Sequence, residues 1–76
     1  MSRLVLVNAI NLEKLVFKLG FTKMRQKGSH VFYRHTDGRT TTIPFHTGKD
    51  IPRPLLRKIL NEVKISVDEY NDLLRM

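Results

Sequence analysis

The sequence contains no cysteine and no tryptophan, and its longest uninterrupted apolar run is Leu4 to Val7. Without cysteine, neither a disulfide framework nor a thiolate metal site can support the fold, and this composition fits a reducing compartment. The short apolar run predicts neither a transmembrane helix nor the hydrophobic segment of a secretory signal. A chain of 76 residues has room for one small domain. We therefore expect a single domain over residues 1–76, in a cytoplasmic protein with no membrane partner.

Acidic side chains are also scarce, because seven Asp and Glu stand against fourteen Lys and Arg, a formal net charge of +7. The excess lies in residues 14–60, which hold eleven basic and two acidic side chains, whereas residues 61–76 hold two basic and four acidic. A basic body of this kind indicates a polyanionic partner, most commonly a nucleic acid. The alternative is a domain whose lysines serve only solvation.

The spacing of apolar residues predicts the helices. An i, i+3, i+4, i+7 pattern indicates an amphipathic helix from about Ala9 to Leu19. Asn8 or Asn11 can cap its start, and Gly20 can take the left-handed conformation after its end. A second apolar stripe follows Pro54, which suits the first turn of a helix.

The remaining signals predict three strands and a short last helix. β-Branched and aromatic residues, interrupted by the turns Gly28-Ser29 and Thr36-Asp37-Gly38, indicate strands at 21–26, 30–35 and 39–45. Ser66 and Glu69 have the spacing of a capping box, which predicts a third helix after them. The fold class is therefore α+β, an αβββα order with a three-stranded antiparallel sheet, helices on one face and an extra short C-terminal helix.

Burial decides between registers for the second hairpin. A two-residue loop at Asp37-Gly38 leaves neither face of the sheet apolar. A three-residue loop with Gly38 at positive φ places all the large apolar residues except Phe32 on one face, and we prefer it. The expected pairs are His35 with Thr41, Tyr33 with Ile43, and Val31 with Phe45.

This register leaves a polar and cationic face open to solvent. It places His30 across from His46, and it brings Arg25 and Lys27 toward the same end of the sheet. Cations of this kind can bind phosphates, and an exposed Phe32 can stack on a base. Burial of Phe32 in a second small core or an interface is the alternative. The open face is expected to carry His30, Phe32, Arg34, Thr40, Thr42 and His46.

Several segments of the chain, from Leu12 to Leu74, resemble the HicA toxins, small mRNA interferases of toxin–antitoxin pairs. The most specific run is Arg-Gln-Lys-Gly-Ser-His at residues 25–30, followed by a hairpin and Ile43-Pro44. The other matching segments are Leu19-Gly20-Phe21, His35-Thr36-Asp37-Gly38-Arg39, Phe45-His46 and Leu56-Arg57-Lys58-Ile59-Leu60.

The resemblance implies a fold like that of the double-stranded-RNA-binding domain and a ribonuclease that acts on translated RNA. It also implies inhibition of growth, and neutralisation by a HicB-type antitoxin that covers the active site. The family's catalytic histidine lies in the Gly-Ser-His turn, which corresponds to His30 of this sequence.

RNA carries its own nucleophile in the 2′-hydroxyl, so an enzyme can cleave it without a metal by moving protons and stabilising charge on phosphorus. Histidine suits the proton step because its ordinary pKa lies near neutral pH. We expect His30 to be the general base or acid, with Lys27 and Arg34 as phosphate contacts and His46 as a candidate second proton-transfer group. Ser29 can bind phosphate or shape the turn, and the turn is the preferred interpretation.

Two other function classes remain open, and neither requires a cofactor. A non-catalytic RNA-binding module can share the basic sheet, although Pro54 stands where such modules supply lysine and amide contacts. A protein-interaction subunit can dock a partner on its apolar and acidic C-terminal helix. The carboxylates and histidines show no spacing typical of a metal site.

Overall fold

The structure is a computed structural model that describes residues 3–46 and 48–76. The predicted αβββα order with an extra C-terminal helix is confirmed. The expected domain over residues 1–76 includes residues 1, 2 and 47, which lie outside the described residues. The elements are α1 (Ala9–Lys18), β1 (Thr22–Lys27), β2 (His30–Arg34), β3 (Thr40–Pro44), α2 (Arg53–Val63) and α3 (Val67–Leu74).

The ends of helix α1 follow from two residues of the sequence. The Asn8 side chain accepts a hydrogen bond of 2.9 Å from the backbone N–H of Asn11, so Asn8 is the N-cap. Gly20 follows the helix with a φ of 97°, a region that glycine enters without steric cost. The buried face of α1 consists of Ala9, Leu12, Leu15 and Val16.

The two C-terminal helices also begin where the sequence predicts. Pro54 lies in the first turn of α2, where a missing N–H leaves no hydrogen bond unmade. Ser66 and Glu69 form a reciprocal capping box at the start of α3, with both hydrogen bonds at 3.1 Å. Both predictions are confirmed.

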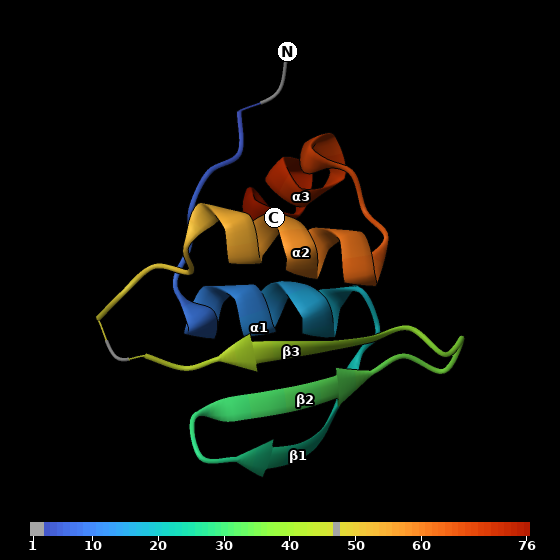
Figure 1. The fold of residues 1–76 in the computed structure, drawn as a ribbon. Coiled ribbons are helices and arrows are strands. Elements are labelled where there is room, and N and C mark those ends of the chain that lie inside the picture. The colour runs from blue at the N-terminus through green and yellow to red at the C-terminus, as the bar shows by residue number, and fades with distance from the viewer. Residues whose placement is uncertain (1–2, 47) are drawn as a thin grey trace.

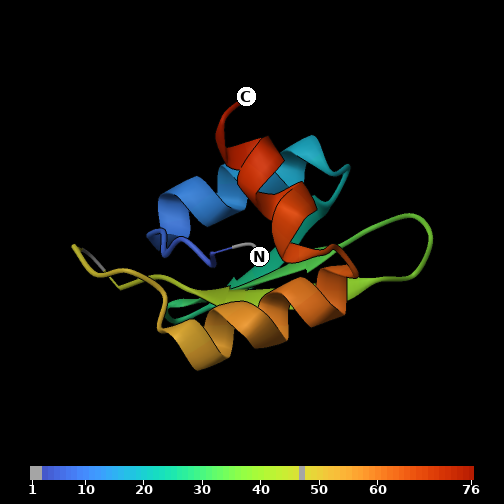
Figure 2. The ribbon, with the colours of Figure 1, turned by 90° about the horizontal axis from the view of Figure 1, so that it is seen from above.

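The three strands form an antiparallel sheet in the order β1-β2-β3, with β1 at the edge remote from the helices (Figure 1). Seen from above, α2 runs beside β3, and α1 and α3 lie across from it (Figure 2). The hydroxyl of Thr41 in β3 donates to the Glu62 carboxylate of α2 at 2.9 Å. This hydrogen bond joins helix α2 to the β3 edge of the sheet. One flank of α2 consequently lies close to the open face.

The register of the β2–β3 hairpin differs from the expected one. The loop does hold three residues, Thr36-Asp37-Gly38, and Gly38 does have a positive φ of 98°, but the pairing of the strands is shifted. Each residue of β2 therefore pairs two positions earlier on β3 than expected, and His30 faces Pro44 instead of His46. The observed pairs are His30 with Pro44, Val31 with Ile43, Phe32 with Thr42, Tyr33 with Thr41, and Arg34 with Thr40.

Hydrogen bonds at the loop explain the shift. The backbone N–H of His35 donates to the carbonyl of Arg39 at 2.8 Å. His35 therefore pairs with Arg39 and not with Thr41, the partner expected from the sequence. The Asp37 carboxylate accepts the backbone N–H of Arg39 at 3.0 Å and its Nε–H at 2.8 Å, so Arg39 is held at the start of β3. These bonds, the backbone N–H of Arg39 first, hold the pKa of Asp37 below its usual range.

The core lies between the sheet and the helices. A register shift of two residues keeps the same side chains on each face, so Val31, Tyr33 and Ile43 are buried as expected. The Tyr33 hydroxyl donates to Glu13 of α1 at 2.5 Å, and burial together with this carboxylate raises the pKa of Tyr33 well above its usual value. The helices contribute Leu12, Leu15, Val16, Leu56, Ile59, Leu60 and Val63.

Helix α3 joins this core through one aromatic side chain. Tyr70 is fully buried, and its hydroxyl donates to the backbone carbonyl of Val5 at 2.5 Å. Burial, with a smaller contribution from the Asp50 carboxylate, raises the pKa of Tyr70 to about 12. The C-terminal helix thus holds the N-terminal segment against the rest of the domain. None of the helices in the described parts of the chain is long and apolar enough to cross a bilayer.

Candidate active site

His30 is the first residue of β2 and directly follows the turn Gly28-Ser29. Gly28 has a φ of 59°, which lets the chain reverse within two residues. The carbonyl of Ser29 accepts the backbone N–H of Phe45 at 2.7 Å, and this bond ties the turn to the end of β3. The His30 side chain is exposed, between Lys27 on β1 and Pro44 on β3.

A β-bulge decides which face of β1 carries the cations. The ladder shifts between Lys23, which pairs with Tyr33, and Arg25, which pairs with Phe32. In a regular strand that leaves a buried Phe21, residues 23, 25 and 27 all lie on the core face of the sheet. The extra residue at the bulge reverses this order, so Arg25 and Lys27 share the open face with His30.

The open face holds a cation stacked on an aromatic ring. The guanidinium carbon of Arg25 lies 4.8 Å from the ring centroid of Phe32. Phe32 is half-buried, and its ring is covered in part by this guanidinium. The exposed surface at this point is therefore an Arg25 guanidinium stacked on the Phe32 ring, rather than a bare ring. In general, guanidinium planes also stack on nucleic-acid bases.

Arg34 lies on the same face but farther along the strand. It is four residues from His30, which corresponds to about 13 Å at the rise of a β-strand. The backbone of Arg34 is therefore farther from His30 than the directly paired Lys27 is. The open face presents its cations as a series along the sheet, and only Lys27 is paired directly with His30.

Helix α2 adds a wall to the site that sequence reasoning missed. His30 lines a groove of about 270 Å³ together with open-face residues of β3 and three residues of α2. The α2 residues are spaced i, i+3 and i+7, so they form one flank of the helix. That spacing is a signal in the sequence, but it does not say which part of the sheet the flank meets. The groove is lined by His30, Thr42, Pro44, Leu55, Lys58 and Glu62.

The other two histidines lie elsewhere. His46 lines a small cleft of about 110 Å³ beside Asn8 and Ile10 at the start of α1, and it does not line the groove of His30. His35 is half-buried, and its ring packs edge-on against Phe21 with centroids 5.3 Å apart. His35 therefore lies toward the core side of the hairpin and not on the open face.

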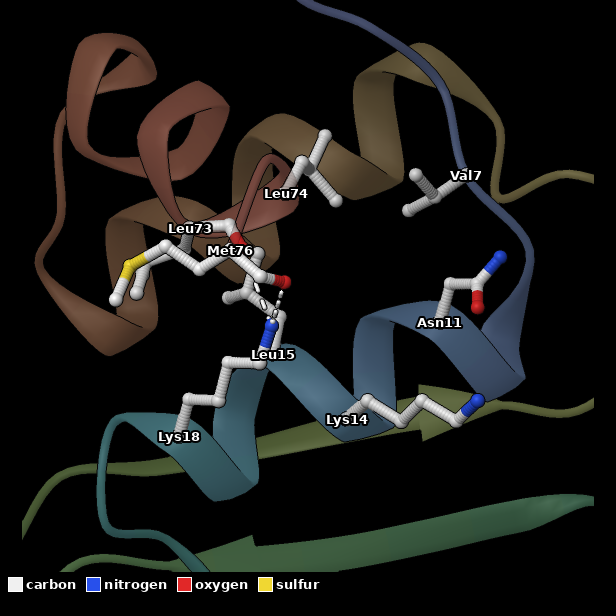
Figure 3. Close-up of a pocket in the computed structure, with 8 residues that line it drawn as sticks. All are labelled: Val7, Asn11, Lys14, Leu15, Lys18, Leu73, Leu74 and Met76. Atoms are coloured by element: carbon white, nitrogen blue, oxygen red, sulfur yellow. Dashed lines mark hydrogen bonds between the residues drawn. The ribbon is translucent and has the colours of Figure 1, made fainter.

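A hollow larger than the groove of His30 lies between α1 and α3 and has a volume of about 410 Å³. Figure 3 shows the ammonium of Lys18 pointing at the last residues of the chain, where it donates to the carbonyls of Leu73 at 3.3 Å and Met76 at 2.9 Å. Lys14 points toward the other end of the hollow. The hollow contains no histidine or carboxylate side chain, so we do not assign acid–base chemistry to it.

Metal ligands do not gather anywhere in residues 3–46 and 48–76, where no three His, Asp or Glu side chains are placed to share an ion. The groups that can do chemistry on the open face are therefore one imidazole, several cations and the half-buried carboxylate of Glu62. This set can move a proton and stabilise an anion.

The protein is thus a small α+β domain of αβββα order, with an exposed histidine among cations on one face of its sheet. The family model that describes the HicA toxin of bacterial toxin–antitoxin systems matches residues 11–65. The match covers more than half of the chain, and the protein belongs to the HicA toxin family. Membership makes it the toxin of a toxin–antitoxin system, with an antitoxin as its partner. A comparison with curated proteins found no match.

Proposed function

We propose that the protein is an endoribonuclease, an mRNA interferase that cleaves single-stranded RNA by metal-independent acid–base catalysis with His30. The observation that carries the proposal is the exposed position of His30, paired with Lys27 and lining a groove with Lys58. Family membership supports the same function, because HicA toxins are the family that the run Arg-Gln-Lys-Gly-Ser-His resembles.

In this mechanism His30 removes the proton of the 2′-hydroxyl, and the 2′ oxygen attacks the adjacent phosphorus. The bond from phosphorus to the 5′ oxygen then breaks, and the leaving oxygen takes a proton from water. The products are a 2′,3′-cyclic phosphate and a free 5′-hydroxyl. Cations beside His30 stabilise the negative charge that grows on the phosphoryl oxygens in the transition state.

The remaining cations of the open face hold the RNA strand on either side of the cleaved bond. Lys27 lies next to His30 and contacts the nearest phosphate, whereas Arg34 contacts a phosphate farther along. The Arg25–Phe32 stack accepts a base. Ser29 shapes the turn, because its carbonyl and the φ of Gly28 hold the reversal in place.

Neutralisation by a HicB-type antitoxin follows from the same surface. The open face carries positive charge from Arg25, Lys27 and Arg34, so a partner with acidic side chains complements it. Such a partner blocks the RNA strand and His30 together. Its removal is therefore sufficient to expose a complete active site.

The test compares the native protein with His30→Ala on a fluorescently labelled single-stranded RNA in the presence of EDTA. We expect cleavage to a cyclic phosphate end by the native protein, and a loss on the order of 10²-fold or more in His30→Ala. Expression in bacteria should arrest growth for the native chain only. Equal RNA retention by both proteins without cleavage identifies a non-catalytic RNA-binding module instead.

A further inference from the structure

The groove at His30 has walls of different origin. One wall is the open face of the sheet, with His30, Thr42 and Pro44, and the other is the flank of α2 that begins at Leu55. Pro44 faces His30 across the ladder and is itself buried, so it forms the floor between the two walls. A group that binds above His30 is therefore in reach of side chains from α2.

Lys58 is the only cation of the described residues that lines this groove. It lies on the exposed side of α2, and within the described part of the chain its ammonium makes no hydrogen bond or ion pair. Glu62 lies one helical turn farther on, but its carboxylate accepts the hydroxyl of Thr41 at 2.9 Å and forms no ion pair with Lys58. The ammonium of Lys58 is thus free to bind an anion.

His30 has a lysine on each side. Lys27 is paired with it on the β1 side, and Lys58 stands beyond Pro44 on the α2 side. Arg34, four residues along β2, is not among the residues that line this groove. An anion above the imidazole is therefore placed between two ammonium groups that come from different elements.

We propose that Lys58 is a second catalytic residue, which binds the phosphate that is cleaved and stabilises its negative charge in the transition state. The inference rests on the proposed ribonuclease function and adds the α2 wall of the groove to that site. Lys58 keeps its proton throughout, while His30 takes the 2′-hydroxyl proton and the 5′ oxygen is protonated by water. A cation at a position where negative charge grows lowers the barrier to the chemical step more than it strengthens substrate binding.

The experiment measures single-turnover cleavage of a labelled single-stranded RNA, at saturating and at half-saturating protein. The variants are Lys58→Met, which keeps the aliphatic part of the side chain, and Lys58→Arg, which keeps the charge. Arg57→Met is the matched control, because Arg57 is the neighbouring exposed cation of α2 and does not line the groove. Thermal unfolding of each variant verifies that the fold is retained.

We expect Lys58→Met to lower the rate at saturation on the order of 10²-fold, with most of the rate recovered in Lys58→Arg. Arg57→Met should stay within about threefold of the native rate, because it removes the same charge outside the groove. The inference is overturned if Lys58→Met and Arg57→Met behave alike, or if the Lys58→Met defect disappears at saturating protein. Absence of cleavage by the native protein instead refutes the ribonuclease function itself, so the two failures are distinguishable.

Discussion

The guanidinium of Arg25 covers the ring of Phe32 at 4.8 Å, and it does so because a bulge displaces β1 by one residue between Lys23 and Arg25. Phe21 is buried in the core, so in a regular strand residues 23, 25 and 27 would face the core as well. The side chains of Arg25 and Lys27 must instead point to the other side of the strand to lie on the open face. The bulge satisfies both requirements in a six-residue strand.

Replacement of Arg25 by Ala should weaken RNA binding without unfolding the protein. The variant loses one phosphate or base contact and one exposed cation–π pair, whose contribution to stability is about 0.5–1 kcal/mol. The slope of log affinity against log salt should fall by about 0.7, the value for one contact on a single strand. RNA binding in a His30→Ala background, measured across a salt series, checks this. An unchanged slope contradicts a role of Arg25 in phosphate binding.

His46→Ala should leave the cleavage rate within about threefold of the native value, because the observed register places Pro44 rather than His46 opposite His30. His46 instead lies beside Asn8 and Ile10, outside the groove. Single-turnover rates of His46→Ala and His30→Ala on the same RNA give the comparison. A loss of 10²-fold or more in His46→Ala restores its assignment as the second proton-transfer group.

Two glycines with nearly equal backbone angles provide a matched pair for stability. Gly20 and Gly38 have φ values of 97° and 98°, a region where alanine is strained at either position. A Cβ at Gly20 comes within 3.0 Å of Nε2 of His35, whereas a Cβ at Gly38 meets nothing within 4 Å. Gly20→Ala should therefore lower the free energy of unfolding by about 1 kcal/mol more than Gly38→Ala.

Urea unfolding of both variants measures this difference. Removal of the His35 side chain provides the control, because the extra cost at Gly20 should vanish in a His35→Ala background. Equal losses in the two single variants contradict the crowding that the structure shows.

The two buried tyrosines predict that stability falls at alkaline pH. The pKa of Tyr70 is raised to about 12 and that of Tyr33 is also raised, both chiefly by burial. Above pH 10, the usual tyrosine value, the folded state thus holds protons that the unfolded state releases, so the free energy of unfolding decreases. Their contribution is complete below about pH 10 and is lost progressively above it.

Urea unfolding at pH 9 and pH 11 measures the effect, at values chosen on either side of the ordinary tyrosine pKa of about 10. Lysines also titrate in this range, so Tyr70→Phe is the reference. The decrease between the two pH values should be smaller in Tyr70→Phe than in the native protein. An identical decrease in both proteins excludes a contribution from Tyr70.

Local signals in the sequence predict most of the fold. The N-cap at Asn8, the proline in the first turn of α2 and the capping box at Ser66 each involve residues within a few positions of one another. Such interactions act before any tertiary contact forms, so a sequence pattern is sufficient to find them. The faces of the hairpin were also predictable, because alternation is preserved when the register slips by an even number of residues.

The register and the α2 wall of the site could not be predicted in this way. The hairpin closes at His35 and Arg39, partly because Asp37 holds Arg39 through two of its hydrogen-bonding groups, and competing closures differ little in sequence. The approach of Lys58 to His30 depends on where α2 settles against β3, which is a result of packing between distant segments. Residues that are far apart along the chain complete the site.

Helix α3 has two acidic residues in its first turn, and positive charge at its C-terminal end comes from its C-cap Arg75 and from Lys18 of α1. Tyr70 meanwhile links the same helix to the carbonyl of Val5. The segment around Val5 is therefore held by α3 from one side, and from the other by Arg53 of α2, which donates to the carbonyl of Leu4 at 3.0 Å. In hydrogen-exchange terms, we expect loss of α3 to lower the protection of amides near Val5, although α3 lies beyond residues 11–65 that the family model matches.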